Sequence, residues 1–479
     1  MNETNMEKKY DLGMIGLGVM GQNLLYNMAE HGFSVMGLDL DEKKAKALEQ
    51  EAPKGTDVRG TTDTKSFVEA LSTPRKITLL VPAGKPVDAV VSSLLPYLEK
   101  GDIIIDGGNS HFIDTLRRVK ELAPKGFHFM GMGVSGGEKG ARFGPSIMPG
   151  GDKEAYQHIQ PILEAICAKV GDNHEPCTAY MGKDAAGHFV KMVHNGIEYA
   201  IMQVISEVYD LLKNGLGYTN DQLHELFGRW NEGRLESFLI EITRDIFATK
   251  DPQTGNYLVD MILDKAGAKG TGKWTSQDAM DTGVAIPSID MSVSMRTLSA
   301  FKEERQKAAA IYKPVVHKLE VSAEVFEKQI EAALFVTVMI CYAQGLELLN
   351  KASEELAMEI PLQDVVKIWR GGCIIRSSHL ETFYQAFQKD PQLSNVLLDP
   401  ILAEEVKEGW QDLRDVVAEA AKSGISIGVI QSSLAYLESL TSAQMPTNLI
   451  QAQRDYFGSH TYQRIDQEGS FHTEWEAHP

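Results

Sequence analysis

One helical stretch, residues 185–206, carries an amine and a carboxylate in an otherwise apolar sequence. With about 100° of rotation per residue, Lys191 and Glu198 fall on one face with His194 and Asn195. Most other positions are apolar, so the pattern predicts a buried helix with a thin polar strip rather than a surface helix. Two long charged side chains two turns apart can converge on one small molecule. The alternative is a structural helix with two incidental charges.

A glycine-rich turn near the N-terminus is typical of dinucleotide binding. A buried strand, Leu12–Ile15, leads into the glycine turn Gly16-Leu17-Gly18-Val19-Met20-Gly21, and a helix follows. Glycines permit the tight turn and let a pyrophosphate approach the free N–H groups of the helix. A second strand, residues 33–38, ends in Asp39, whose carboxylate would accept hydrogen bonds from the adenine ribose.

The residues after that second strand bear on which dinucleotide is used. A 2′-phosphate beside the Asp39 carboxylate would be repelled, and Leu40-Asp41 supply no arginine to receive it. The sequence therefore favours NAD. NADP stays open as the alternative, because Lys43 and Lys44 follow closely.

Strand and helix patterns alternate over the rest of residues 1–183. Further strands are expected at 77–81, 103–106 and 127–130, which predicts a parallel, doubly wound Rossmann-type sheet. Ligands bind at the carboxyl ends of such strands. The candidate residues at these ends are Val81, Pro82, Ala83, Asn109, Ser135, Gly136, Gly137 and Glu138.

Helical periodicity dominates residues 184–442, so we predict an all-helical second domain. Trp230 and Gly233 recur as Trp369 and Gly372, which indicates either a duplicated helical unit or a chance match. The predicted class is therefore α/β plus all-α.

A glycine-rich segment inside this second domain holds further candidates for binding an anion. Lys269, Thr271 and Lys273 lie among glycines at 267–272, where they could hold a phosphate or belong to a simple linker. Arg296 is the next candidate anion ligand.

The last segment, residues 443–479, changes character at Met445-Pro446 and becomes polar with scattered aromatic residues. Such a tail has too little apolar sequence for a core of its own, so we expect it to dock on another subunit. Arg454 and His460 would then be delivered to a site.

Composition narrows the partners and the compartment. The net charge of −19 argues against nucleic acid and acidic membranes. The sequence shows no run of the roughly eighteen apolar residues that a membrane span needs, and its first residues do not resemble a signal peptide. The four cysteines lack CxxC spacing, so we expect neither a zinc site nor disulfides. We therefore expect the protein to reside in the reducing cytoplasm.

Six blocks in this order resemble the 6-phosphogluconate dehydrogenase family, the long decarboxylating type. The blocks are GLGVMGQNL at 16–24, DGGNS at 106–110, GVSGGEKGAR at 133–142, GHFVKMVHNGIEY at 187–199, KGTGKW at 269–274 and NLIQAQRDYFGSHTY at 448–462. The resemblance covers essentially the whole chain. It implies a homodimer that oxidises 6-phosphogluconate with a nicotinamide, releases CO2 and forms ribulose 5-phosphate without a metal ion.

The resemblance also implies roles for individual residues. Lys191 matches the general base on the 3-hydroxyl, and Glu198 matches the acid that protonates C1 after decarboxylation. Burial would lower the pKa of a lysine from about 10.4 and raise that of a glutamate, which suits both roles. The matched ligands of the sugar acid are Ser135, Gly136, Gly137, His194 and Asn195. The matched ligands of the phosphate and distal hydroxyls are Tyr199, Lys269, Thr271, Arg296, and the partner subunit's Arg454 and the partner subunit's His460. Asn109, Met20 and Glu138 match the nicotinamide side.

Two departures from the family pattern reinforce the expectation of NAD. Members that use NADP usually have Asn-Arg-Thr where this chain has Asp39-Leu40-Asp41, and Val-Lys-Ala-Gly where it has Val81-Pro82-Ala83-Gly84. Both changes remove groups that could bind a 2′-phosphate.

Two alternatives for the function are another β-hydroxyacid dehydrogenase and a catalytically silent dinucleotide-binding protein.

Overall fold

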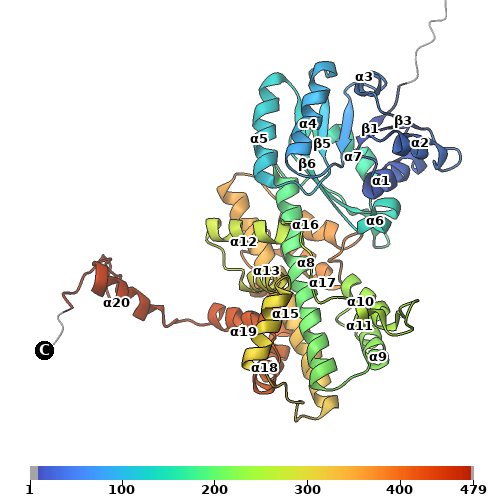
Figure 1. Ribbon diagram of the computed structural model, residues 1–479. Helices are drawn as coiled ribbons and strands as arrows, with labels where there is room; N and C mark the ends of the chain where they lie inside the picture. The colour runs from blue at the N-terminus through green and yellow to red at the C-terminus, as the bar shows by residue number, and fades with distance from the viewer. Residues whose placement is uncertain (1–8, 476–479) are drawn as a thin grey trace, which may run out of the picture.

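A computed structural model describes residues 9–475 of the chain. An N-terminal sheet domain and a helical domain pack together, and a C-terminal segment extends away from both (Figure 1). Helix α8 (Ala186–Asp210) leaves the sheet domain and runs through the helical one. The first turns of α8 therefore lie where the two domains meet (Figure 1).

The N-terminal domain contains a seven-stranded sheet in the order β3-β2-β1-β4-β5-β6-β7. The strands are β1 (Leu12–Ile15), β2 (Val35–Leu38), β3 (Val58–Thr61), β4 (Lys76–Leu79), β5 (Ile103–Asp106), β6 (His128–Ser135) and β7 (Ser146–Gly150). Ile103 and Ile105 of β5 pack in one apolar core, and Ile104 packs in another on the opposite face. Helices cover both faces, so the predicted doubly wound Rossmann-type fold is confirmed.

Two details of the sheet differ from the expectation. Strand β7 pairs antiparallel with β6, so the sheet is mixed rather than fully parallel. Strand β3 was not predicted, because its sequence Val-Arg-Gly-Thr is half exposed and lacks an apolar run. It pairs with β2 at the edge of the sheet.

Helices of the first domain alternate with the strands. They are α1 (Val19–Glu30), α2 (Glu42–Gln50), α3 (Thr64–Glu69), α4 (Lys85–Leu94), α5 (Phe112–Leu122), α6 (Gly137–Phe143) and α7 (Lys153–Ile166). Short 3₁₀ turns η1 (Leu95–Tyr97) and η2 (Ala123–Lys125) follow α4 and α5, and a small ribbon of β8 (Lys169–Val170) and β9 (Glu175–Pro176) precedes α8.

The second domain is helical from α8 onward, as predicted. After a π turn, η3 (Leu211–Gly215), its helices are α9 (Asn220–Asn231), α10 (Phe238–Ala248), α11 (Leu258–Met261), α12 (Thr271–Thr282), α13 (Pro287–Ser299), α14 (Lys302–Tyr312), α15 (Ala323–Glu355), α16 (Leu362–Trp369), α17 (His379–Lys389), α18 (Pro400–Ser423) and α19 (Gly428–Leu440), with a 3₁₀ turn η4 (Val396–Leu398). Helices α8 and α15 pack against each other, and each precedes two shorter helices. This similar order of elements agrees with a duplicated helical unit, and the duplication stays a prediction.

Helix α15 is apolar along most of its length. Among residues 9–475 it is the one helix long and apolar enough to cross a membrane, with a mean hydropathy of 1.7 over its best window. That window is 89% buried inside the protein. This largely apolar helix therefore belongs to the core of the helical domain.

The C-terminal segment forms a small unit of its own around a carboxylate. Its helix α20 (Thr447–Gly458) lies away from the body of the chain (Figure 1). The buried Asp455 side chain accepts hydrogen bonds from the main-chain N–H groups of Thr461 and Thr473 and from the indole of Trp475. A polar centre, rather than an apolar core, therefore holds the tail together.

Candidate active site between the sheet and helix α8

The glycine turn has the shape that a pyrophosphate requires. A Cβ on Gly21 would lie 2.0 Å from the carbonyl oxygen of Gly16, and one on Gly16 would lie 2.4 Å from that of Leu80. Gly18 begins α1 without a side-chain cap, and nothing lies within 4 Å of the position that its Cβ would take. The turn is therefore closed on the protein side and open at the helix N-terminus, which fits a bound dinucleotide.

A groove of about 500 Å³ continues from this turn along the carboxyl ends of the strands. Gly16, Gly18, Asp39, Val81 and Pro82 line it, as predicted from their positions after the strands. Leu17 and Met20 belong instead to the apolar core beneath the sheet, and Val19 is exposed. Thr64 also lines the groove, and the sequence analysis missed it because strand β3, just before it, was not predicted.

Main-chain groups fix the Asp39 carboxylate at the end of β2. Oδ2 accepts from the N–H of Leu17 at 2.8 Å, and Oδ1 accepts from the N–H of Asp41 at 3.0 Å. Leu40 beside it is 93% exposed. The ammonium of Lys44 lies 3.6 Å from Oδ2 and is about half exposed, so it compensates only part of the negative charge.

Helix α8 packs unusually close to strands β6 and β7. A Cβ on Gly187 would lie 2.2 Å from the carbonyl oxygen of Gly131, and one on Gly133 would lie 2.4 Å from the Cβ of Lys191. Glycine on both sides lets the helix approach, and the approach buries Lys191, which is 6% exposed. The predicted interior position of this helix is therefore confirmed.

A chain of hydrogen bonds joins the end of β6 to the polar strip. Asn195 Oδ1 accepts from His194 Nδ1 at 3.0 Å, which leaves Nε2 to accept from the Ser135 hydroxyl at 3.2 Å. Lys191 Nζ lies 3.5 Å from His194 Nδ1, and Glu198 Oε2 lies 3.7 Å from the same nitrogen. His194 thus stands between the amine and the carboxyl group.

Burial sets the protonation of these groups. It lowers the pKa of the Lys191 amine, against the opposing charge of Glu198, and it raises the pKa of the Glu198 carboxyl, against the charges of Lys191 and Arg296. Burial and the Lys191 charge hold the pKa of His194 well below its usual range. The imidazole is therefore neutral, while the amine and carboxyl group are suited to exchange protons.

Asn195 and Tyr199 of α8 contact three segments that carry basic or hydroxyl groups. The Arg296 guanidinium lies 3.6 Å above the Tyr199 ring, and the main-chain N–H of Lys269 lies 3.4 Å from the Tyr199 hydroxyl. Asn195 donates to the Thr271 hydroxyl at 3.2 Å, at the N-terminus of α12. The structure therefore brings the four predicted phosphate-end residues of this chain to one place.

A segment that sequence reasoning did not assign to the site completes it. The N–H of Ile374 donates to Ser135 Oγ at 3.4 Å, and the Trp369 ring meets His194 edge to face. Gly136 has φ 117°, and a Cβ there would lie 2.5 Å from the carbonyl oxygen of Gly372. The Trp369 and Gly372 repeat was the only signal for this segment.

The remaining predicted residues differ in their placement. Asn109 is exposed on the loop after β5, and Gly137 and Glu138 begin α6. Arg454 and His460 lie in the tail, away from this site in the same chain (Figure 1). Within residues 9–475 no three His, Cys, Asp or Glu side chains gather as a metal site, and the four cysteines are buried and unpaired.

A glycine turn suited to a dinucleotide, together with a buried lysine and a partly buried glutamate on one helix face, is typical of a nicotinamide-dependent oxidoreductase. Family models agree: the NAD binding domain of 6-phosphogluconate dehydrogenase matches residues 11–182, and the 6-phosphogluconate dehydrogenase C-terminal domain matches residues 187–475. The chain belongs to the 6-phosphogluconate dehydrogenase family, in its decarboxylating form.

Relatives of nearly full length support this membership. The chain is 52% identical over 98% of its length to an NADP(+)-dependent, decarboxylating 6-phosphogluconate dehydrogenase of Bacillus subtilis, and 49% identical over 98% to the decarboxylating enzyme of Escherichia coli K12; each match covers 99% of the relative. The solved Plasmodium falciparum enzyme has 45% identity and a TM-score of 0.94, and the match covers 97% of this chain and 100% of that one. That enzyme was solved apo, with its cofactor NADP+ and with its substrate 6-phosphogluconate. These matches favour the family reaction over the other β-hydroxyacid dehydrogenase and the silent binding protein.

Proposed function

We propose that the protein converts 6-phosphogluconate to ribulose 5-phosphate and CO2, with Lys191 as base and Glu198 as acid. The neutral Lys191 amine takes the proton of the 3-hydroxyl group. When bound, the nicotinamide accepts the hydride from C3. The protonated Lys191 then polarises the new keto oxygen while the C1–C2 bond breaks and CO2 leaves. Lys191 gives its proton to the resulting enolate oxygen. Glu198 then protonates the terminal carbon of the enediol, which is C2 of the substrate and C1 of the product, while Lys191 takes back the hydroxyl proton, which gives the ketose.

The burial of Lys191 beside Glu198, with neutral His194 between them, is the observation that carries this proposal. Ser135, His194 and Asn195 form one hydrogen-bonded chain that can orient the sugar acid at its carboxylate end. Tyr199, Lys269, Thr271 and Arg296 suit its phosphate end, since they supply a guanidinium, an ammonium and hydroxyl groups.

A substrate comparison tests the phosphate assignment. We expect 6-phosphogluconate to be used with a kcat/KM about 10³-fold above that of gluconate, because the cationic end of the site is left without its partner when the phosphate is absent. Initial rates of nicotinamide reduction, with released CO2 measured in parallel, check this. Equal use of gluconate, or reduction without CO2 release, would contradict the proposal.

Replacing Glu198 by Gln separates the last proton transfer from the first. We expect Glu198→Gln to lower kcat by about 10²–10³-fold, because the amide keeps the shape but has no acid proton to give. Oxidation of the substrate at C3, with Lys191 as base, still occurs, so stopped-flow absorbance should show one equivalent of reduced nicotinamide formed rapidly before slow turnover.

The pH profile gives a second reading of the same variant. The wild-type rate should fall toward high pH as Glu198 loses its proton, and this basic limb should disappear in Glu198→Gln. Glu207→Gln is the matched control: Glu207 lies on the same helix, is more deeply buried than Glu198 and binds the main chain of Val429 and Ile430 instead. An unchanged kcat in Glu198→Gln would remove Glu198 from the mechanism.

For the cofactor we propose NAD as the preferred nicotinamide dinucleotide, with NADP as the alternative. The rigid Asp39 carboxylate supports NAD, since it can accept from ribose hydroxyls and repels a 2′-phosphate. The B. subtilis relative is named NADP(+)-dependent and the P. falciparum enzyme was solved with NADP+. The proposal therefore assigns this chain a cofactor preference different from theirs.

We also propose a homodimer in which the tails are exchanged. The tail presents an apolar face of Leu449, Tyr456, Phe457 and Trp475, all of which are exposed in the single chain. Such a face is stabilised when it docks on a second copy. The exchange would bring the partner subunit's Arg454 and the partner subunit's His460 to the phosphate end of the site.

The buried, unpaired cysteines support a reducing compartment, so we propose that the protein is cytoplasmic.

A further inference from the structure

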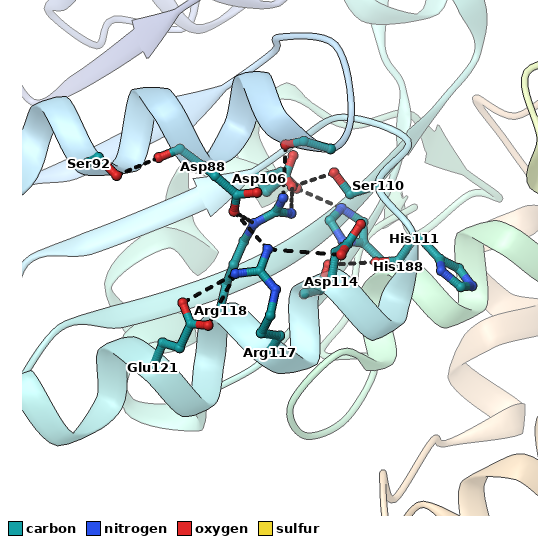
Figure 2. Close-up of polar contacts among 12 residues, drawn as sticks. Asp88, Ser92, Asp106, Ser110, His111, Asp114, Arg117, Arg118, Glu121 and His188 are labelled. Carbon is teal, nitrogen blue, oxygen red and sulfur yellow. Dashed lines mark hydrogen bonds and ion pairs between the residues drawn. The ribbon is translucent and has the colours of Figure 1, made fainter.

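A buried charge cluster lies beneath the site without touching the proposed ligands. Arg118 of α5 is 2% exposed, and its Nε donates to Asp88 Oδ1 at 2.8 Å (Figure 2). Its Nη1 lies 3.6 Å from Asp106 Oδ2 at the end of β5. Asp106 is fully buried. A buried ion pair of this kind adds little net stability, because desolvation offsets the attraction.

Arg118 reaches two loops at the carboxyl edge of the sheet, directly at Gly84 and through Asp106. Arg118 Nη2 donates to the carbonyl oxygen of Gly84 at 3.0 Å, at the end of the predicted cofactor loop 81–84. Asp106 accepts from the N–H of Gly108 at 3.0 Å and from the hydroxyl of Ser110 at 2.6 Å. These two bonds fold residues 107–110 around the carboxylate and leave Asn109 between them exposed.

The same cluster reaches the catalytic helix through His188. His188 Nε2 donates to the main-chain oxygen of Asp106 at 2.9 Å, and Nδ1 accepts from the Thr115 hydroxyl at 2.6 Å (Figure 2). Burial lowers the pKa of His188, so the ring is neutral and donates through one nitrogen only. His188 lies one helical turn before Lys191 on α8. The Asp106 segment is thus bonded both to the Asn109 loop and to the helix that carries the base.

We propose that Arg118 is a positioning residue, which acts through Asp106 and His188 to fix the Asn109 loop and the cofactor loop against Lys191. This inference rests on the proposed function, since it assigns Arg118 the task of aligning hydride donor and acceptor. A guanidinium suits it, because Nε and Nη2 donate to Asp88 and Gly84 while Nη1 lies 3.6 Å from Asp106, and the single nitrogen of an ammonium does not reproduce this spread of donors.

A second buried arginine, at the opposite end of β5, provides a matched control. Arg75 is also buried and pairs with Asp102 and Glu99, each at 2.9 Å. Asp102 immediately precedes β5 and Asp106 ends it, so the two arginines hold opposite ends of one strand. Only the Arg118 end lies at the carboxyl edge where ligands bind. Arg75→Met therefore removes a comparable ion pair without touching the loops of the site.

Steady-state kinetics on the full-length protein distinguish positioning from stability. In Arg118→Met we expect kcat to fall about 30-fold to 100-fold, with KM for 6-phosphogluconate within about threefold, because a displacement of about 1 Å at the reacting atoms costs this much. Arg118→Lys should recover only part of the loss. The deuterium isotope effect with substrate labelled at C3 should rise, since misalignment makes hydride transfer slower than product release.

Arg75→Met should lower the thermal midpoint at least as much as Arg118→Met, yet keep kcat within about threefold and leave the isotope effect unchanged. Equal losses of kcat in the two variants would overturn the positioning role. If Arg118→Met does not fold, Ser110→Ala takes its place, because it removes only the hydrogen bond to Asp106. Its kcat should then fall while KM stays within about threefold, and a loss of kcat equal to that of Arg75→Met would again overturn the positioning role. A wild-type protein that does not oxidise 6-phosphogluconate would instead refute the proposed function itself, whatever Arg118 does.

Discussion

Replacing Lys191 by Met is expected to lower kcat by about 10⁴-fold while substrate still binds. The variant keeps the length and burial of the side chain but loses both the base and the cation that polarises the keto oxygen. Dissociation constants for 6-phosphogluconate should change by less than about tenfold, since the phosphate-end residues remain. Nicotinamide reduction measures the first effect, and isothermal titration calorimetry measures the second.

The pH dependence and a matched variant make this prediction sharper. Burial lowers the pKa of Lys191, and the wild-type rate should fall toward acidic pH as this amine gains its proton. Lys191→Met should lose this acidic limb. Lys183→Met is the control, because Lys183 lies just before α8 but is about half exposed and pairs with Glu359. Turnover of Lys191→Met near the wild-type rate would refute the proposed base.

Exchanging Asp39 and Leu40 for the residues of the NADP pattern should reverse the cofactor preference. We expect the wild type to favour NAD over NADP by at least about tenfold in kcat/KM. In Asp39→Asn/Leu40→Arg the ratio should shift toward NADP by about 10²–10³-fold, because a like charge some 4 Å from a phosphate is worth up to about 4 kcal/mol near a protein surface and each 1.4 kcal/mol is tenfold. Initial rates with both cofactors measure the ratio.

Glu42→Gln controls for net charge in this experiment. Glu42 lies three residues after Asp39, is exposed and pairs with Lys46 at 2.7 Å, so it removes one negative charge without altering the end of β2. Its ratio should stay within about twofold of the wild type. A wild-type preference for NADP would mean that Lys44, 3.6 Å from Asp39, outweighs the carboxylate, and the electrostatic argument would be wrong.

The sequence alone determined those features that short-range patterns encode. The glycine turn, the strand that ends in Asp39 and the polar strip of α8 each depend on residues within one or two turns or strands of each other. Their spacing predicted the doubly wound sheet, the helical domain and the buried position of Lys191. Strand β3 and the antiparallel direction of β7 escaped prediction, because β3 is short and half exposed and the direction of β7 depends on its pairing with β6.

Only the tertiary structure decided how distant segments share the site. The contact between Ser135 and Ile374 and the bond between His188 and Asp106 join residues far apart in sequence. The neutral state of His194 depends on burial that several elements create together. Packing and desolvation depend on the whole fold, so no local pattern could reveal that a buried guanidinium connects loop 81–84, through Asp106, to helix α8.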